Sequence, residues 1–333
     1  MANVTKNTLD ALNTIFVLSS MDLPREAAYV IIVIALPAYI FSVVCNLLLI
    51  ITVVSNRTLH EPMYILLCNL SFNDIVGISA LVPRSVFDMM FDYGLITFPA
   101  CFLQAWCLHT YGAATVLILS VMAFDRYVAI CHPLRYHTIM SKATLIHLIG
   151  SSWFLVFIVC AVLFGITLQY PICRKEIPTY YCDNLTMLKL TCAADITVSN
   201  IYGLVITAAF HTVGFFSIVF TYSCILITCC KSNDSESKSK AWHTCGTHLT
   251  VFVIFEMSCA AIVLFYRIPN TPNIIQKILG LGYVIIPNCI NPVIYGLKTK
   301  DIKVKVKLFR NRMIGLNNLN ISKHEFAKTV SLV

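Results

Sequence analysis

The sequence predicts an all-α membrane protein: a seven-transmembrane helix bundle with a short amphipathic helix on the cytoplasmic side. Of its 333 residues, 58% are hydrophobic and only 12% are charged, about half the charged share of an ordinary soluble domain. A helix needs about 20 mostly apolar residues to cross a bilayer core of about 30 Å. Stretches of that length without Asp, Glu, Lys or Arg are therefore the expected spans.

Seven stretches fit this description. Five contain no charged residue: 29–54, 101–124, 143–173, 196–230 and 278–297. Two more, 63–82 and 249–266, are equally apolar except for one carboxylate each, Asp74 and Glu256. The chain is therefore expected to divide into an extracellular N-terminal segment, the helix bundle and a cytoplasmic segment, over residues 1–28, 29–297 and 298–333.

The segment after the last span is rich in basic residues. Ile302, Val306 and Phe309 recur there at helical spacing among Lys and Arg side chains. This pattern favours an amphipathic helix over 298–312 that lies on the cytoplasmic leaflet. The alternative is a disordered basic tail.

Basic residues also predict the orientation of the bundle, because the cytoplasmic flanks of membrane spans retain Lys and Arg. With an extracellular N-terminus most basic residues fall on the inner side, and the net charge of +8 indicates attraction to membrane lipid and not to nucleic acid. We therefore expect a multi-pass protein of the plasma membrane. Asn3 and Asn184 begin Asn-X-Thr sequons on the outer side, and both are predicted to be glycosylated.

Four of the 15 cysteines lie on the outer side, in an oxidising compartment. Cys101 opens the third span, and Cys173, Cys182 and Cys192 follow in the long loop before the fifth. Four cysteines permit three pairings, and their spacing cannot choose among them. We favour Cys101–Cys182, which would hold the loop over the mouth of the bundle, together with Cys173–Cys192. The alternative is one bridge and two free thiols.

Polar side chains inside the spans are costly unless they face the bundle interior and find partners. Asn46, Asp74 and Asn291 fall at similar distances from the inner ends of their spans. We expect them to share one buried network with water or a sodium ion near Asp74, and we expect no other cofactor. The alternative is an ordinary polar contact between helices.

Two motifs mark the cytoplasmic ends of the third and seventh spans. Asp125, Arg126 and Tyr127 place an acid beside an arginine at the membrane boundary, where opposite charges hold each other until the helix packing changes. Pro292 follows Asn291 in the last span and removes a hydrogen bond from the helical ladder. A kink there is expected to be a moving part.

Together these elements resemble the rhodopsin-like G-protein-coupled receptors from about residue 29 to 310. Five motifs resemble the odorant receptors more specifically: PMY at 62–64 with LSFND at 70–74, MAFDRYVAICHPLRY at 122–136, TY at 221–222, KAWHTCGTHL at 240–249 and PNCINPVIYGLKTK at 287–300. The ending YGLKTK resembles the fish-type branch, which implies a water-soluble odorant.

The resemblance implies roles for particular residues. Arg126, with Asp125, would hold the resting inner face and then contact a stimulatory heterotrimeric G protein that raises cyclic AMP. Tyr222 and Tyr295 would rearrange as the sixth span moves outward. Ligand binding would shift the receptor toward the state that is open inside.

A small organic odorant is expected to bind among the outer halves of spans three, five, six and seven. Helical faces counted from the motifs predict a mostly apolar pocket lined by Leu108, His109, Gly112, Ala113, Gly203, Ile206, Thr207, Phe210, Glu256, Cys259, Ala260, Val263 and Leu281. The alternative for any one of these residues is packing against a neighbouring helix.

Glu256 departs from the family pattern, which commonly has an aromatic residue at this position. The outer halves of the neighbouring spans offer no Lys or Arg to neutralise it. We favour a protonated Glu256 that forms a hydrogen bond with Tyr111, His109 or Tyr283, because burial disfavours the charged form. The alternative is a counter-charge for a cationic ligand.

Other classes fit the sequence less well. An opsin needs a lysine in the last span, where 278–297 has none, and an aminergic receptor would carry Asp where Leu108 stands. A transporter or channel would show inverted repeats and several buried charges, and an enzyme would show a glycine loop or a nucleophile constellation. We assign His243, Cys245 and His248 to packing or G-protein contact and expect no metal. A receptor for an endogenous hormone or lipid is the nearest alternative.

Overall fold

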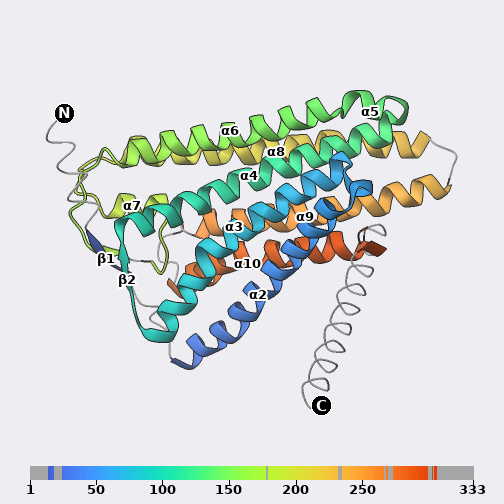
Figure 1. Ribbon diagram of the computed structural model, residues 1–333. Helices are drawn as coiled ribbons and strands as arrows, with labels where there is room; N and C mark the ends of the chain where they lie inside the picture. The colour runs from blue at the N-terminus through green and yellow to red at the C-terminus, as the bar shows by residue number, and fades with distance from the viewer. Residues whose placement is uncertain are drawn as a thin grey trace, which may run out of the picture.

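The predicted seven-helix fold is confirmed by a computed structural model, which describes residues 14–18, 25–177, 179–231, 235–265, 268, 273–298, 302, 304 and 305, with the backbone alone for 235–245, 273–274 and 296–298. Seven helices are long and apolar enough to cross a membrane. They are α2 (Arg25–Ser55), α3 (Pro62–Phe91), α4 (Phe98–Cys131), α6 (Lys142–Thr167), α8 (Thr197–Lys231), α9 (Ser235–Phe265) and α10 (Asn273–Lys298). Figure 1 shows them side by side as one elongated bundle.

Shorter elements connect the long helices. The inner turns contain η1 (Arg57–Leu59), η2 (Pro133–Arg135) and α5 (Tyr136–Ile139), and the long outer loop contains α7 (Asn184–Lys189). Most of the amphipathic helix predicted over 298–312 lies outside the described residues. Of that segment's described side chains, Ile302 is buried and Val304 is exposed.

Local sequence signals set several helix ends. Pro62 occupies the first turn of α3, where its missing N–H costs no hydrogen bond, and Asp92 ends that helix in the left-handed conformation with φ 50°. Ser141 caps α6 by accepting a hydrogen bond from the Thr144 N–H at 3.2 Å. The charge-free stretch 143–173 is longer than its helix, which ends at Thr167.

Burial separates central helices from peripheral ones. In the apolar windows of α3 and α4, 56% and 50% of residues are buried inside the protein, against 17% in α2 and 22% in α6. Two helices therefore form the centre of the bundle, and two present most of their side chains outward, as helices that face lipid do.

A small sheet covers the outer end of the bundle (Figure 1). Strand β1 (Ile15–Leu18) lies between β2 (Leu95–Thr97), to which it is antiparallel, and β3 (Glu176–Ile177), to which it is parallel. Phe16 and Leu18 point inward and are buried, whereas Ile15 and Val17 are exposed. The sequence analysis missed this sheet, because strands this short show too little alternation to be recognised.

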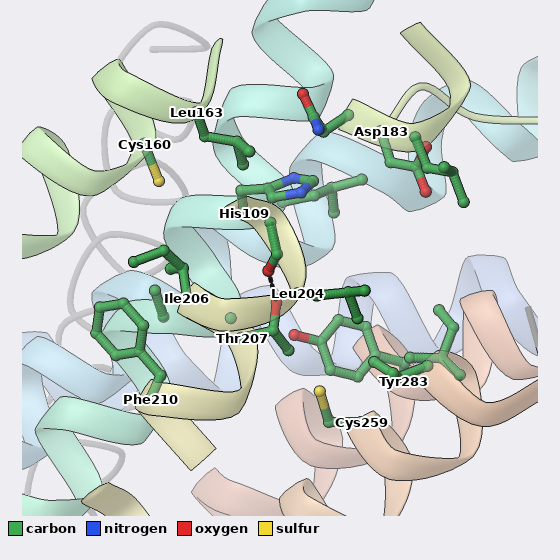
Figure 2. A pocket seen from close by; sticks show the side chains of 18 of the residues that line it. His109, Cys160, Leu163, Asp183, Leu204, Ile206, Thr207, Phe210, Cys259 and Tyr283 are labelled. Atoms are coloured by element: carbon green, nitrogen blue, oxygen red, sulfur yellow. Dashed lines mark hydrogen bonds between the residues drawn. The ribbon is translucent and has the colours of Figure 1, made fainter. Parts of the chain in front are cut away.

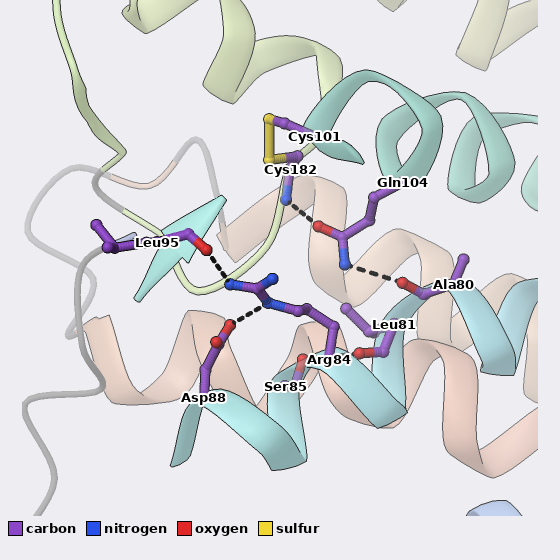
Figure 3. A network of polar contacts seen from close by, with 9 residues as sticks. All are labelled: Ala80, Leu81, Arg84, Ser85, Asp88, Leu95, Cys101, Gln104 and Cys182. Atoms are coloured by element: carbon purple, nitrogen blue, oxygen red, sulfur yellow. Dashed lines mark hydrogen bonds and ion pairs between the residues drawn. A yellow bond between two sulfur atoms is a disulfide. The ribbon is translucent and has the colours of Figure 1, made fainter. Parts of the chain in front are cut away.

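Two disulfides fix the long outer loop. Cys101 bonds to Cys182 across 81 residues, and Cys173 bonds to Cys192 across 19 residues. Gln104 then links the loop to two helices: its Oε1 accepts from the Cys182 N–H at 2.8 Å, and its Nε2 donates to the Ala80 carbonyl at 2.9 Å (Figure 3). The loop is therefore held over the outer mouth of the bundle.

The sheet has its own anchor on α3. The Arg84 Nε lies 2.7 Å from the Asp88 carboxylate one turn later, and its Nη2 donates to the Leu95 carbonyl of β2 at 2.6 Å (Figure 3). Because the carboxylate orients the guanidinium, the arginine can hold the edge of the sheet against the helix.

Candidate functional site

A cavity of about 260 Å³ lies among α4, α6, α8, α9 and α10 beneath the long outer loop. Its wall is mostly apolar, as is usual for sites that bind small organic molecules. Figure 2 shows His109 and Asp183 in one part of this space and Cys259 and Tyr283 in another. The polar groups are therefore distributed around an apolar interior.

Ten of the thirteen pocket residues predicted from helical periodicity line the cavity. The predicted residues that line the cavity are Leu108, His109, Gly112, Ala113, Gly203, Ile206, Thr207, Phe210, Cys259 and Val263. The prediction is wrong for Glu256, Ala260 and Leu281, which do not line it. Ala260 is exposed on the outside of α9, and the face that α10 turns to the cavity carries Gly280 and Tyr283 instead of Leu281.

The outer loop supplies a part of the wall that helical periodicity could not predict. Its lining residues are Tyr181, Asp183, Asn184, Leu185 and Leu188. Asp183 also begins α7 by accepting a hydrogen bond from the Thr186 N–H at 2.6 Å. The course of this loop follows from disulfides and caps, neither of which has a periodic sequence signal.

The Asn184 sequon lies in a tightly packed part of the outer loop. Its side chain is buried, and its Oδ1 accepts a hydrogen bond at 2.7 Å from the Thr167 hydroxyl, which also lies 2.9 Å from the Ser199 hydroxyl. A glycan on the Asn184 amide would need space that the packed loop occupies. The other predicted acceptor, Asn3, lies outside the described residues.

Glu256 has a partner that the sequence analysis missed. Its Oε2 lies 2.7 Å from the Nδ1 of His211 on α8, so the prediction of Tyr111, His109 or Tyr283 as partner is wrong. The hydroxyl of Tyr111 donates elsewhere, and the His109 Nδ1 lies 3.0 Å from the carbonyl of its own helix one turn earlier. His211 was overlooked because it stands in a charge-free span and histidine has no fixed charge.

Pro292 accounts for the hydrogen bonds that α2 donates at the centre of the buried polar network. Because proline has no N–H, the Asn288 carbonyl one turn earlier lacks its helical donor. Two side chains of α2 donate to that carbonyl instead: the Ser42 hydroxyl at 2.9 Å and the Asn46 amide at 3.2 Å. The helix therefore continues past the proline to Lys298, and α2 is joined to α10 at this point.

Asp74 joins the same network from α3. Its Oδ2 accepts from the Asn291 amide at 2.8 Å, and its backbone carbonyl accepts from the Asn288 amide at 3.0 Å. The structure thus brings the three predicted residues together, with Asn288 between Asn46 and Asp74. The Oδ1 atoms of Asn46 and Asp74 are buried without a hydrogen-bond partner among the described residues. Such acceptors suit a water molecule or a small cation.

Two further polar contacts extend the network into α4. The Tyr111 hydroxyl donates to the Asn288 Oδ1 at 2.8 Å, and the Asn73 amide donates to the Thr115 hydroxyl at 2.9 Å. All four side chains are buried. Their signal in the sequence was polarity inside a span, but asparagine, threonine and tyrosine are too common there to single out these four.

At the C-terminal end of α4, the Asp125 carboxylate accepts hydrogen bonds on both of its oxygens. Arg126 is ion-paired with its Oδ2, and the Tyr136 hydroxyl of α5 donates to its Oδ1 at 2.8 Å. Burial and the neighbouring carboxylate raise the pKa of Tyr136, so the hydroxyl remains a donor at physiological pH. Tyr127 lies beside them with its hydroxyl 3.1 Å from the His132 ring.

The inner ends of α9 and α10 meet at Tyr295. Its hydroxyl lies 3.1 Å from the Nδ1 of His248, and both side chains are buried. Tyr222 is partly buried and packs against the core from α8. In the part of the chain that the structure describes, no group of His, Cys, Asp or Glu could hold a metal ion; the side chains of His243 and Cys245 lie outside it.

Comparison with known proteins decides the family. Residues 35–312 match the family described as olfactory receptor. The chain is 35% identical to human olfactory receptor 13C9 over 283 residues, which covers 82% of this chain and 88% of that protein. It is 32% identical to mouse olfactory receptor 4M1 over 307 residues, covering 92% and 97%. The chain belongs to the olfactory receptor family.

Membership of the olfactory receptors makes this chain a G-protein-coupled signalling receptor and not an enzyme. With its seven apolar helices, the olfactory receptor is a multi-pass protein of the plasma membrane. Squid rhodopsin has the same fold, with a TM-score of 0.72 over 90% of this chain and 91% of that one, at 13% identity. That likeness concerns the fold alone, because only 13% of the sequence is identical.

Proposed function

We propose that this olfactory receptor binds a small organic odorant in the outer cavity and activates a stimulatory heterotrimeric G protein, which raises cyclic AMP. The observation that carries the proposal is the cavity: a mostly apolar space at the outer end of the bundle, covered by a disulfide-anchored loop. Such a space excludes water from a small ligand and leaves a few polar groups to orient it.

The lining favours a ligand with a short apolar body and at least one polar group. His109 and Asp183 offer hydrogen bonds in one part of the cavity, and Tyr283 offers another in a second part. Glu256 is engaged with His211 and lies outside the lining, which disfavours the counter-charge role. The fish-type ending at 295–300 supports a water-soluble odorant as the natural ligand.

The cytoplasmic ends of the helices support coupling by a population shift. Arg126 is held by Asp125, so a resting contact exists that a change in helix packing can release. Tyr295 and His248 join α9 to α10, and an outward movement of α9 would separate them. A ligand that binds the open-inside state more tightly raises its population and exposes Arg126 to the G protein.

The Asp74 Oδ1, which has no hydrogen-bond partner among the residues that the structure describes, supports a water molecule or sodium ion as a further component of the resting network. A cation there would be held by a carboxylate in a site of low dielectric, where such attraction is strong. Its release would accompany rearrangement around Pro292.

The basic residues support an extracellular N-terminus, with 298–312 on the cytoplasmic leaflet in contact with anionic lipid. The Cys101–Cys182 bridge is consistent with this orientation, because disulfides form in the oxidising compartment outside the cytosol.

The test is a cyclic AMP assay in cells that express the receptor with an olfactory-type stimulatory G protein, screened against water-soluble odorants. Arg126→Ala should abolish the ligand-dependent rise while its surface level, measured by antibody on intact cells, equals that of the native receptor. A response that survives in Arg126→Ala would contradict the coupling mechanism. Responses to an endogenous hormone or lipid, but to no odorant, would favour the alternative ligand class.

A further inference from the structure

A thiol in the cavity wall lies beside an imidazole. His211 of α8 stands between two side chains of α9: its Nδ1 is 2.7 Å from the Glu256 Oε2, and its Nε2 is 3.0 Å from the Cys259 Sγ. We take the imidazole Nδ1 as the donor and the Glu256 Oε2 as the acceptor, in place of the protonated Glu256 favoured from the sequence, because an ionised carboxylate can only accept. The lone pair of Nε2 then faces the thiol. A base that is oriented by a third group in this way activates cysteine nucleophiles.

The thiol is also accessible to a ligand. Cys259 and His211 both line the cavity, and Figure 2 shows the Cys259 sulfur beside the ring of Tyr283. The Tyr283 hydroxyl lies against Gly112 in the same part of the space, where it can donate to a carbonyl oxygen. A base, a nucleophile and a hydrogen-bond donor therefore converge on one volume.

We propose that Cys259 binds electrophilic ligands covalently, so that the cavity takes α,β-unsaturated aldehydes and ketones. This inference rests on the proposed function, in which the cavity is the odorant site. The Cys259 proton moves to the His211 Nε2, and the thiolate forms a C–S bond to the β-carbon of the ligand. The π electrons of the C=C bond move toward the carbonyl to give an enolate, which takes a proton at the α-carbon from the imidazolium. The addition is redox-neutral and has no leaving group.

A second thiol in the same wall provides a matched comparison. Cys160 of α6 also lines the cavity, but its hydrogen-bond contact is the Thr110 hydroxyl at 3.9 Å, which is not a base. Both thiols meet the same ligand, and only Cys259 has an imidazole beside it. Selectivity between them therefore reports activation and not access.

The experiment uses the full-length receptor in lipid nanodiscs, an alkyne-tagged 2-alkenal as probe, and peptide mass spectrometry to quantify adducts at each cysteine. We expect Cys259 to be labelled at least about tenfold faster than Cys160, since thiolate formation controls the rate. The exposed Cys230 shows in the same sample that the probe reacts. Equal labelling of the two cavity thiols, or labelling of Cys230 without Cys259, would overturn the proposal.

His211→Asn tests the role of the base. Asn keeps a donor toward Glu256, and labelling of Cys259 should fall about tenfold while labelling of Cys160, which reports an intact cavity, stays unchanged. Unchanged labelling of Cys259 would refute activation by His211. Adduct formation does not require the G protein, so labelling without a cyclic AMP response would reject the coupling proposal alone. A cyclic AMP response to unsaturated aldehydes without labelling of Cys259 would reject covalent binding alone.

Discussion

Replacing Gly77 by alanine should destabilise the receptor by displacing Tyr111 from the buried network. A Cβ at Gly77 would lie 2.4 Å from the Cδ2 and 2.5 Å from the Cγ of the Tyr111 ring, whereas carbon atoms in contact are about 3.5–4.0 Å apart. The ring is fully buried and its hydroxyl donates to Asn288 at 2.8 Å. It must therefore move by about 1 Å, which breaks or lengthens that hydrogen bond.

Three effects contribute to the expected loss of folding free energy in Gly77→Ala. Overpacking a buried site costs about 1–3 kcal/mol, and leaving a buried hydrogen-bonding group unpaired costs about 1–3 kcal/mol. Alanine offsets about 0.5–1 kcal/mol of this, because it is the better helix former. The central values of these ranges give a net loss of about 3 kcal/mol, which lowers the ratio of folded to unfolded receptor by a factor of about 150.

The assay is the thermal inactivation midpoint of the detergent-solubilised receptor, with Gly150→Ala as the matched control. A Cβ at Gly150 meets no atom within 4 Å, so this variant should be as stable as the native receptor or slightly more so. Gly77→Ala should lower the midpoint by at least about 4 °C. Equal midpoints for the two variants would show that the Tyr111 ring is not fixed in place, and the reasoning would fail.

Three further predictions test the cavity, the inner face and the outer loop. Ala113→Leu fills part of the cavity and should raise the half-maximal odorant concentration at least about tenfold, whereas Ala260→Leu, on the outer face of α9, should leave it unchanged in the same cyclic AMP assay. Tyr136→Phe removes a donor worth about 1 kcal/mol from the resting inner face and should raise basal cyclic AMP about fivefold at equal surface expression. Since the raised pKa of Tyr136 keeps the hydroxyl protonated well above neutral pH, this effect should be the same at pH 6.5 and pH 8. Asn3→Gln should remove an endoglycosidase-sensitive band shift on a gel, and Asn184→Gln should not alter it; a lost band in the second variant would contradict the buried placement of that residue.

The cavity residues show how far helical periodicity extends. Leu108 and Thr207 were predicted correctly to line it, because a helix repeats every 3.6 residues and one reference motif fixes which face is inward. The same counting was wrong for Leu281, since α10 turns Gly280 and Tyr283 to the cavity instead. Side-chain facing at the edge of a helical face depends on packing against neighbours and not on local sequence.

By itself, the sequence determined the seven spans, the family motifs and the presence of an acid beside Arg126. Each of these depends on a local property: the cost of charge in a bilayer or the identity of adjacent residues. Only the tertiary structure decided which side chains meet across helices: His211 with Glu256, and Asn288 between Asn46 and Asp74. Those contacts depend on the rotation and register of helices that are distant in the chain. Because one residue of register turns the side chains of a helix by about 100°, a small change in packing replaces these partners, and no local pattern of residues encodes them.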